Sequence, residues 1–418
     1  MLPAAALARF YSRFRVSERV LLTGHSHQAW PDAGYEAQKQ AWLDAADLVD
    51  RKWGRAFAMA ERVREGFRLC LTDPAADLAL GLNTHELVTR FLSALPLGDR
   101  PRLVTTDGEF ATVRRQLARL EEEGIEVVRV SAGDPDGLGQ GLASAVDDKT
   151  AAVVVSVVLF ETGRIAGGLD RAAAACRLHG AELLVDAYHA LNAVPFSIPE
   201  LGLEDAFVVG GGYKYCQLGE GVCFLRVPPG CRLRPVLTGW FAEFGTVAAE
   251  SAGRSEAASR PGAASGKRAE YPAEVVYGAA GQDRFAGATY DPVSHYRGAA
   301  VFGFFGQQGM TPDALRRRSL AQIGRLTEGV DDLDLDPSFL DRDRSAPLES
   351  FGGFMVLRAP RAGRLCEALS ARGIYSDYRG RMLRLGPAPY VTDSQLDEAI
   401  DALREAAVEC GAEERGTV

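Results

Sequence analysis

An uninterrupted apolar run in the middle of the chain constrains the fold most strongly. Residues 151–158 read Ala-Ala-Val-Val-Val-Ser-Val-Val, which is typical of a parallel strand that is covered on both faces. Strand-like and helix-like segments alternate around it: strands at 103–106, 126–130, 182–186, 206–209 and 222–225, and helices at 113–123 and 171–179. This alternation predicts an α/β fold, with a mostly parallel sheet between two layers of helices.

The chain is long enough, at 418 residues, to form two lobes. After residue 296 the sequence predicts helices at 296–308, 311–326, 361–372 and 392–408 and strands at 355–357 and 382–385, and we expect a smaller α/β C-terminal domain at 296–418. We assign 51–295 to the large domain and 1–50 to an N-terminal segment that packs with the small domain. Residues 248–281 are rich in Ala, Ser, Gly and Arg and predict a flexible insert. Whether this insert covers a substrate stays open.

Composition excludes several classes of function. A net charge of −9 and a pI near 5.4 argue against nucleic acid or an anionic membrane as a partner. No apolar run is long enough to span a bilayer, and the N-terminus lacks the basic region of a signal peptide. The seven cysteines are scattered and show no metal-ligand spacing, so we expect no disulfide framework and no metal site. A cytoplasmic enzyme that acts on a small molecule fits these features.

One lysine stands in an unusual setting. Lys214 lies in Gly-Gly-Gly-Tyr-Lys-Tyr-Cys (210–216), directly after the apolar segment 206–209. The four other lysines of the chain lie in polar helical or loop sequence. A lysine that is buried loses proton affinity, and its amine becomes nucleophilic, as Schiff-base chemistry requires. A surface lysine after a glycine turn is the alternative, and the local sequence does not separate the two.

An acid at a strand end adds weight to the first alternative. Asp186 ends the apolar segment 183–185, and His189 follows three positions later. Ligands of open α/β sheets bind at the carboxyl ends of strands, and a carboxylate there can keep a pyridine nitrogen protonated. Alone, Asp186 could equally be a helix cap or a turn residue. Followed by the lysine loop, it favours a site for pyridoxal 5′-phosphate (PLP).

These motifs together resemble the kynureninase branch of the fold type I, class V aminotransferase-like PLP enzymes. The resemblance runs over about 21–403 apart from the insert, and rests on Gly-Tyr-Lys-Tyr at 212–215, Asp186-x-x-His189 and Gly-Trp-Phe at 239–241. Near the C-terminus, Asp377-x-Arg379 and Arg384-x-Gly386-x-x-Pro389 continue it. It implies a large domain with a mostly parallel seven-stranded sheet, a smaller C-terminal domain, and a homodimer whose subunits share each site.

The resemblance also implies roles for individual residues. Lys214 would be joined to the cofactor aldehyde, Asp186 would pair with its ring nitrogen, and Arg384 would bind the substrate α-carboxylate. The other residues that it places at the cofactor are Asn83, Thr84, His85, Phe110, Thr112, His189, Tyr213, Trp240 and Thr289. Within this set Phe110 would stack on the ring, Thr84 and Tyr213 would hold the phosphate, and Thr289 would serve the phosphate of the partner subunit. Each residue also has an ordinary structural explanation, such as core packing or helix capping.

Departures from the family pattern concern the substrate. The N-terminal Gly-Asn-Ser-Leu-Gly of the family is Gly-His-Ser-His-Gln at 24–28, and its Asn-Phe-Pro-Thr-Asp is Glu-Phe-Ala-Thr-Val at 109–113. His25, Ser26 and His27 would therefore face the substrate, where the histidines could bind its side chain or move protons. A surface pair of histidines is the alternative.

The resemblance implies a kynureninase-like hydrolysis that splits kynurenine, or a substituted kynurenine, at the Cβ–Cγ bond into an anthranilate and alanine. The main alternative shares the cofactor: a β-elimination, as in a C–S lyase, or a decarboxylating or deaminating reaction on a cysteine conjugate or other specialised amino acid. A cysteine desulfurase is a weaker alternative, because the segment 375–382 lacks a cysteine. An aminotransferase is also a weaker alternative, although no motif excludes it. A dinucleotide-binding protein is weaker still, because the glycine cluster lacks the GxGxxG pattern.

Overall fold

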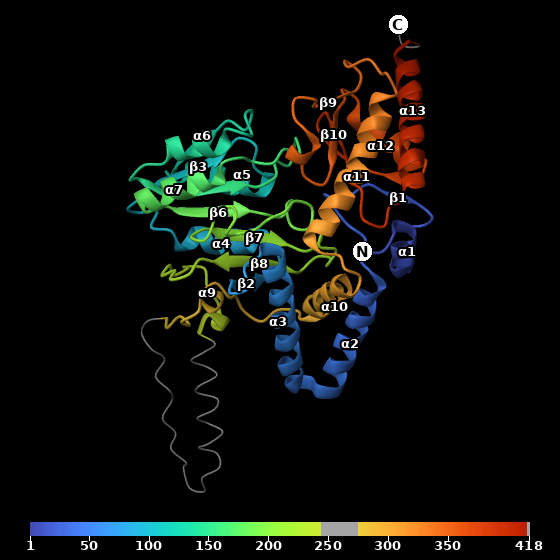
Figure 1. Ribbon diagram of the computed structural model, residues 1–418. Helices are drawn as coiled ribbons and strands as arrows, with labels where there is room; N and C mark the ends of the chain where they lie inside the picture. The colour runs from blue at the N-terminus through green and yellow to red at the C-terminus, as the bar shows by residue number, and fades with distance from the viewer. Residues whose placement is uncertain (244–274, 416–418) are drawn as a thin grey trace, which may run out of the picture.

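A computed structural model describes residues 1–243 and 275–415 of the chain. The predicted insert at 248–281 therefore falls mostly outside the described residues. Within them, a large α/β part carries the main sheet, and a smaller α/β part formed by the C-terminal residues lies beside it (Figure 1).

The large part is built on a seven-stranded sheet with the order β2-β8-β7-β6-β5-β3-β4. Strands β3 to β7 run parallel to one another, whereas β8 is antiparallel to both of its neighbours, β2 and β7. The strands are β2 (Asp77–Gly81), β3 (Arg102–Thr106), β4 (Glu126–Val130), β5 (Thr150–Ser156), β6 (Glu182–Asp186), β7 (Phe207–Gly211) and β8 (Cys223–Val227). The prediction of an α/β fold with a mostly parallel sheet of seven strands is confirmed.

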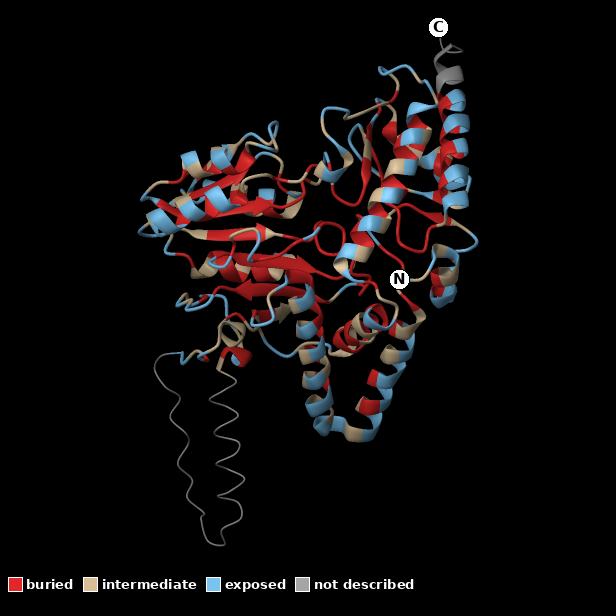
Figure 2. Ribbon diagram, viewed as in Figure 1, coloured by how far each residue is buried: buried red, intermediate tan, exposed pale blue. Residues whose placement is uncertain are grey.

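Two layers of helices cover this sheet because its strands are apolar on both faces. One layer consists of α4 (Thr84–Ala94) and α5 (Ala111–Glu122), which share an apolar cluster with Val154 and Leu184. The other layer contains α3 (Lys52–Leu71), α6 (Leu138–Ala145) and α7 (Leu169–His179), which share a cluster with Val153 and Leu183. Figure 2 shows the strands buried and the outer sides of the helices exposed.

The smaller part contains a four-stranded antiparallel sheet with the order β12-β13-β10-β9. Its strands are β9 (Asp341–Arg342), β10 (Met355–Arg358), β12 (Asp377–Arg379) and β13 (Met382–Leu385). Helices α11 (Pro312–Asp331), α12 (Ala362–Ala371) and α13 (Asp393–Arg415) lie beside it, with the one-turn η4 (Leu348–Ser350) (Figure 1). Between the two sheets in sequence lie η3 (Trp240–Glu243), α9 (Gly281–Arg284) and α10 (Val293–Gln307).

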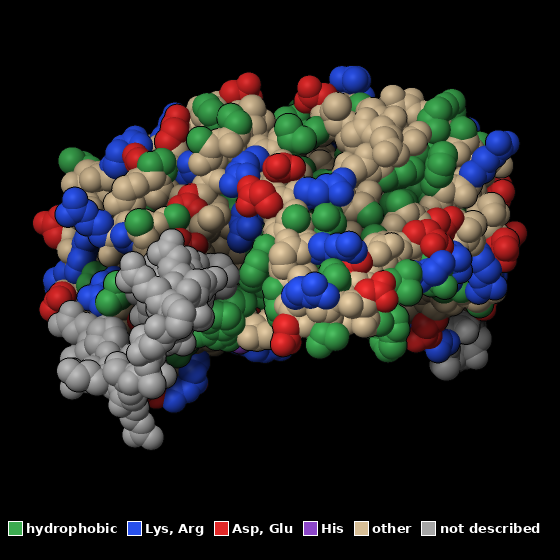
Figure 3. All heavy atoms as spheres, turned by 90° about the horizontal axis from the view of Figure 1, so that it is seen from below, with side chains coloured by type: hydrophobic (Ala, Val, Ile, Leu, Met, Phe, Trp, Pro, Cys, Tyr) green, Lys and Arg blue, Asp and Glu red, His purple; other side chains and the backbone are tan. Residues whose placement is uncertain are grey.

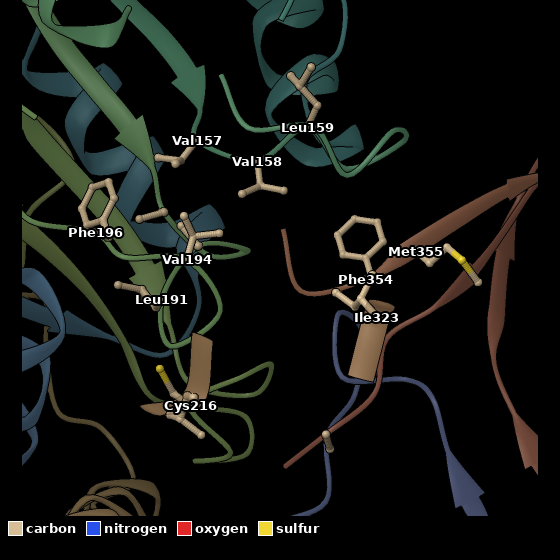
Figure 4. Packing of buried hydrophobic residues seen from close by; sticks show 14 of the residues in the cluster. Val157, Val158, Leu159, Leu191, Val194, Phe196, Cys216, Ile323, Phe354 and Met355 are labelled. Atoms are coloured by element: carbon tan, nitrogen blue, oxygen red, sulfur yellow. The ribbon is translucent and has the colours of Figure 1, made fainter. Parts of the chain in front are cut away.

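The N-terminal residues connect the two parts. They form α1 (Ala4–Ala8), η1 (Arg9–Phe14), β1 (Val20–Leu21), α2 (Asp32–Leu48) and η2 (Val49–Arg51). Strand β1 pairs in parallel with β11 (Ile374–Tyr375) of the C-terminal part, while α2 packs against α10. One apolar cluster continues across the junction, where Phe354 and Ile323 lie opposite Leu191 and Val194 (Figure 4).

Phe67 provides a test of how α3 is held to the sheet. Its side chain is fully buried and packs on Phe224 and Phe302, with ring centroids 4.4 and 5.2 Å away. Phe67→Ala removes these contacts and leaves a cavity, and we expect the free energy of unfolding to fall by about 3–5 kcal/mol. Urea denaturation measures the loss. Leu69→Ala is the matched control in the same helix: Leu69 is 76% exposed, so its effect should stay within about 0.5 kcal/mol.

The surface mixes charged and apolar side chains. Figure 3 shows Lys and Arg interspersed with Asp and Glu on the face that it displays. Among residues 1–243 and 275–415, no helix has both the length and the apolar character that crossing a membrane requires.

Candidate active site

The loop that carries Lys214 leaves the carboxyl end of β7 and packs tightly against its neighbours. A Cβ atom on Gly211 would lie 2.5 Å from Cys223 Sγ, and one on Gly212 would lie 2.5 Å from the side chain of Leu218. Only glycine permits so close an approach. The loop turns Lys214 inward, and this lysine is only 7% exposed.

The amine of Lys214 lies between a histidine and aromatic rings. Its Nζ is 2.9 Å from Nε2 of His189 and 4.7 Å from the ring centroid of Tyr188. Burial lowers the pKa of Lys214 to about 7, although the nearby Asp186 carboxylate acts in the opposite direction. Burial and the lysine charge hold the pKa of His189 well below its usual range. Much of Lys214 is therefore a neutral, nucleophilic amine near neutral pH.

The lowered pKa of Lys214 predicts how the stability of the cofactor-free protein depends on pH. Between pH 7 and 10.5 this lysine keeps more of its proton in the unfolded chain, where its pKa is 10.5, than in the folded chain, where its pKa is about 7. The unfolded chain then binds more protons, so the free energy of unfolding rises with pH in this window. From pH 7 to about 9.5 we expect a gain on the order of 3 kcal/mol from this residue. Urea denaturation measures it, and Lys214→Met, which has no titrating amine, should lack it. An equal gain in both proteins would contradict the prediction.

Asp186 ends β6, and it lines a small cavity together with Lys214. Its Oδ1 accepts a hydrogen bond from the backbone N–H of Tyr188 at 2.8 Å. Burial raises the pKa of Asp186, and the charge of Lys214 opposes that effect. The cavity is also lined by Thr84 and Phe110, and Lys214 Nζ lies 5.8 Å from the Phe110 ring centroid. The structure thus brings the predicted lysine, carboxylate and aromatic ring together.

A larger cleft of about 590 Å³ adjoins this cavity and shares Thr84, Phe110 and Tyr188 with it. Two helices begin at its wall: α4, capped by Asn83 Oδ1, which accepts from Glu86 N at 2.8 Å, and α5, which starts after Phe110. Helix starts carry a partial positive charge that favours an anion such as phosphate. The predicted residues that line the cleft are Asn83, Thr84, His85, Phe110, Thr112 and Tyr213.

Tyr213 stands beside these helix starts. Burial raises the pKa of its hydroxyl to about 12, so the group keeps its proton and can donate a hydrogen bond. The ring of His27 stacks on Tyr213 with centroids 5.1 Å apart, and His27 Nδ1 is 3.2 Å from Glu220 Oε1. The edge of the cleft thus combines hydrogen-bond donors with aromatic surface.

Arg384 is buried and already paired. Its Nε and Nη2 donate to the two carboxylate oxygens of Asp377 at 2.8 and 2.6 Å, and its Nη1 donates to Phe160 O at 3.0 Å. This fork-to-carboxylate geometry is the strong form of an ion pair. The pairing places the guanidinium rigidly, and Phe160 lines the Lys214 cavity. The predicted carboxylate-binding arginine therefore lies near the lysine, with part of its donor capacity in use.

The two predicted histidines differ in environment. His25 is 1% exposed, its Nε2 lies 2.7 Å from Asp377 Oδ1, and burial lowers its pKa to about 4. His27 is exposed at the edge of the cleft. Ser26, between them, makes a turn through its backbone N–H, which donates to Thr23 O at 2.8 Å. The interpretation as a surface pair fails for His25 and holds for His27.

Trp240 and Thr289 are not part of the Lys214 cavity in this chain. Trp240 is 46% exposed, and its Nε1 donates to Thr289 Oγ1 at 3.2 Å. Thr289 lines a separate cavity of about 400 Å³ with Tyr290 and the buried His295. The structure places these two residues together, but away from the lysine.

Three residues of the site escaped the sequence-based assignment. Asp377 belongs to the C-terminal family pattern without a role of its own there, yet it joins Arg384 to His25. Glu109 and Ser156 form a buried hydrogen-bonded pair next to Asp186. Two signals could have identified them: Ser156 is the one polar residue of the apolar run 151–158, and Glu109 replaces an asparagine of the family pattern.

The residues present fit PLP. A buried lysine whose pKa is lowered, a carboxylate within the same cavity and an aromatic ring match the aldehyde, the ring nitrogen and the ring face of that molecule. The adjoining cleft offers helix starts and the Tyr213 hydroxyl to a phosphate. Its volume lies in the range of small-molecule sites.

Comparison with known protein sequences gives the family to which this site is similar. Residues 315–403, which include Asp377 and Arg384, match the kynureninase C-terminal domain family. A kynureninase of Bacillus cereus is 24% identical over 343 residues, covering 77% of this chain and 71% of that protein. A mitochondrial cysteine desulfurase of Arthroderma benhamiae is 29% identical over 150 residues, covering 35% of this chain and 29% of that protein.

Comparison with solved structures identifies the fold. The apo cysteine desulfurase from Thermococcus onnurineus NA1 superimposes with a TM-score of 0.77 at 15% identity, covering 97% of this chain and 98% of that chain. The complex of the cystine C–S lyase C-DES with cysteine persulfide gives a TM-score of 0.74 at 16% identity, covering 93% and 98%. The predicted fold type I architecture is therefore confirmed.

Proposed function

We propose that this chain, a kynureninase-like PLP-dependent enzyme with fold type I, hydrolyses the Cβ–Cγ bond of kynurenine or a substituted kynurenine. The products would be an anthranilate and alanine. The observation that carries the proposal is the buried Lys214 beside Asp186 in one cavity, in a chain whose residues 315–403 match the kynureninase C-terminal domain family. That region supplies Arg384 to the neighbourhood of the lysine.

The residues that would hold the cofactor follow from the geometry of the site. Lys214 would link to the aldehyde, Asp186 would face the ring nitrogen and Phe110 would stack on the ring. The phosphate would lie at the start of α4, where Thr84 and Tyr213 line the cleft. When bound, PLP supplies an electron sink that stabilises negative charge on carbon atoms of the substrate.

The chain's own residues would then perform four tasks. Arg384 binds the α-carboxylate of the substrate and so fixes which bonds face the cofactor. Lys214, as a neutral amine, accepts the proton that leaves Cα and can return a proton to carbon. Asp186 keeps the ring nitrogen protonated. His189, 2.9 Å from Lys214 Nζ, holds that amine in place. Water adds to the γ-carbonyl carbon, and the Cβ–Cγ bond breaks. Cβ takes up a proton, and the products are alanine and the aromatic acid.

A β-elimination is the second candidate, because the similar solved structures include a cystine C–S lyase and cysteine desulfurases. A desulfurase-type reaction needs a reactive thiol near the substrate. Residues 375–382, before Arg384, contain no cysteine. Cys366 lies on α12, where its Sγ is 3.5 Å from Ser376 O. These positions favour hydrolysis or a simple elimination over sulfur transfer.

We also propose that two copies of the chain form the working enzyme. Trp240 is half exposed and hydrogen-bonded to Thr289, away from Lys214 of its own chain. In a homodimer both residues could serve the phosphate of the partner subunit. Light scattering after gel filtration measures the mass, and a purely monomeric active enzyme would refute this arrangement.

Product analysis tests the reaction. The purified enzyme with PLP is incubated separately with kynurenine, 3-hydroxykynurenine and an S-aryl cysteine conjugate, and the products are identified by mass spectrometry. Anthranilate or its 3-hydroxy form, with equimolar alanine, supports hydrolysis. Pyruvate with a free thiol supports β-elimination. If all three substrates are recovered unchanged while the protein binds PLP, both reactions are wrong for these substrate classes.

A further inference from the structure

Glu109 is a buried carboxylate close to the proposed cofactor site that the reaction above does not use. It lies between β3 and α5, directly before Phe110, and is 2% exposed. Among the described residues it has no lysine or arginine partner, since the ion pairs of the protein lie elsewhere. A buried acid without a cation is costly, so its presence calls for a specific explanation.

Hydrogen bonds tie Glu109 to the ends of two strands. Its Oε1 accepts from Thr106 Oγ1 at 2.8 Å and from Ser156 N at 3.1 Å. Its Oε2 accepts from Ser156 Oγ at 2.6 Å. Thr106 ends β3 and Ser156 ends β5. Glu109 therefore holds together the edge of the sheet at which the proposed cofactor site lies.

Ser156 connects this network to Asp186. The two residues are register partners on the parallel strands β5 and β6, and both line the Lys214 cavity. Burial raises the pKa of Glu109 to about 7, and the charge of Asp186 acts in the same direction. The two carboxylates thus interact through space, and a cation bound to Asp186 would favour the ionised form of Glu109.

We propose that Glu109 is a positioning residue of the cofactor site: it fixes Ser156 beside Asp186, and its negative charge strengthens the preference of Asp186 for a protonated ring nitrogen. The inference rests on the proposed function, because it requires PLP in this cavity. The charged and titratable groups that face this region are Asp186 on β6, Lys214 after β7 and His189 after β6. Thr106 and Ser156 are its uncharged contacts.

A substitution can separate charge from geometry here. Glu109→Gln keeps the length of the side chain and an oxygen that can accept from Thr106 and Ser156, but it removes the charge. Thr106→Val is the comparison variant, because it removes one hydrogen bond to Glu109 but keeps a carboxyl group that can still ionise. A purely structural role would make the two variants behave alike at the cofactor.

The measurement is the affinity for PLP and for the analogue in which the ring nitrogen is replaced by C–H, both followed by visible absorbance. The ratio of the two dissociation constants reports the ring nitrogen alone, because Lys214, His189 and the phosphate contacts are common to both ligands. We expect Glu109→Gln to reduce the preference for PLP over the analogue about tenfold. Thr106→Val weakens the ionised form of Glu109 without abolishing it, so it should change this ratio much less than Glu109→Gln does while lowering the melting temperature.

The possible results are distinct. An unchanged ratio in Glu109→Gln would overturn the role of the charge, whatever happens to stability. Failure of the wild-type protein to bind either ligand would instead overturn the proposed function. If Glu109→Gln does not fold, the wild-type protein is measured from pH 6 to pH 8 instead. Its preference for PLP over the analogue should rise as Glu109 ionises, and a preference that does not change with pH would refute the proposal.

Discussion

Lys214→Ala is expected to abolish the visible absorbance of the lysine–PLP linkage and to lower turnover by at least about 10³-fold. The substitution removes both the amine that would hold the aldehyde and the base that would take the α-proton. Of the four other lysines of the chain, the three that lie in the described residues, Lys39, Lys52 and Lys149, do not line the cavity that contains Asp186. Absorbance spectra, steady-state kinetics and borohydride trapping followed by peptide mass spectrometry measure the three consequences.

Lys149→Ala is the control for that experiment. Lys149 is exposed in a turn after α6, and its loss should leave the colour, the trapped peptide and the turnover unchanged. The trapped label should lie on the peptide that contains Lys214. A label on another lysine, or a Lys214→Ala protein that stays yellow and active, would show that this amine is not the one joined to the cofactor.

The sequence was sufficient for the layered fold because its signals are local. The apolar run 151–158 predicts a buried strand, and the structure has β5 at Thr150–Ser156. The sequence also predicts that the glycine-rich loop and the acid at the end of β6 lie close together, because parallel strands bring their carboxyl ends to one edge of the sheet. Lys214 and Asp186 indeed meet there in one cavity.

The remaining parts of the site depend on contacts between distant segments, which no local pattern encodes. His25 and His27 are two residues apart, yet one is buried against Asp377 and the other is exposed. Asp377 reaches His25 only because β1 pairs with β11 and brings the N-terminal segment to the C-terminal part. The pairing of Glu109 with Ser156 similarly joins residues 47 positions apart. Such contacts follow from the tertiary fold.

Arg384 is the second residue whose substitution should have a large effect. It should lower the stability of the protein and also weaken substrate binding, and these two consequences must be separated. Arg384→Ala removes the bidentate partner of the mostly buried Asp377 carboxylate and leaves it only the longer ion pair with Arg379, at 3.5 Å, and the contact with His25. Breaking a buried pair in this way should lower the free energy of unfolding by about 3 kcal/mol. Loss of the guanidinium, whose remaining N–H donors would bind the substrate carboxylate, should also raise the KM for the amino-acid substrate roughly 100-fold, since hydrogen bonds to charged groups contribute about 1.5–3 kcal/mol.

A structural role alone would produce the first consequence without the second, so the variants must distinguish them. Asp377→Asn weakens the same ion pair but keeps the guanidinium, and it should lower stability while the KM changes far less. Arg384→Lys keeps a positive charge but not the bidentate geometry, and its KM should lie between those of the wild type and Arg384→Ala. The deciding measurement compares the substrate with its α-carboxamide. The wild type should strongly prefer the carboxylate, and Arg384→Ala should lose that preference. If Arg384→Ala discriminates as well as the wild type, then Arg384 only supports the fold through Asp377, and another group must bind the carboxylate.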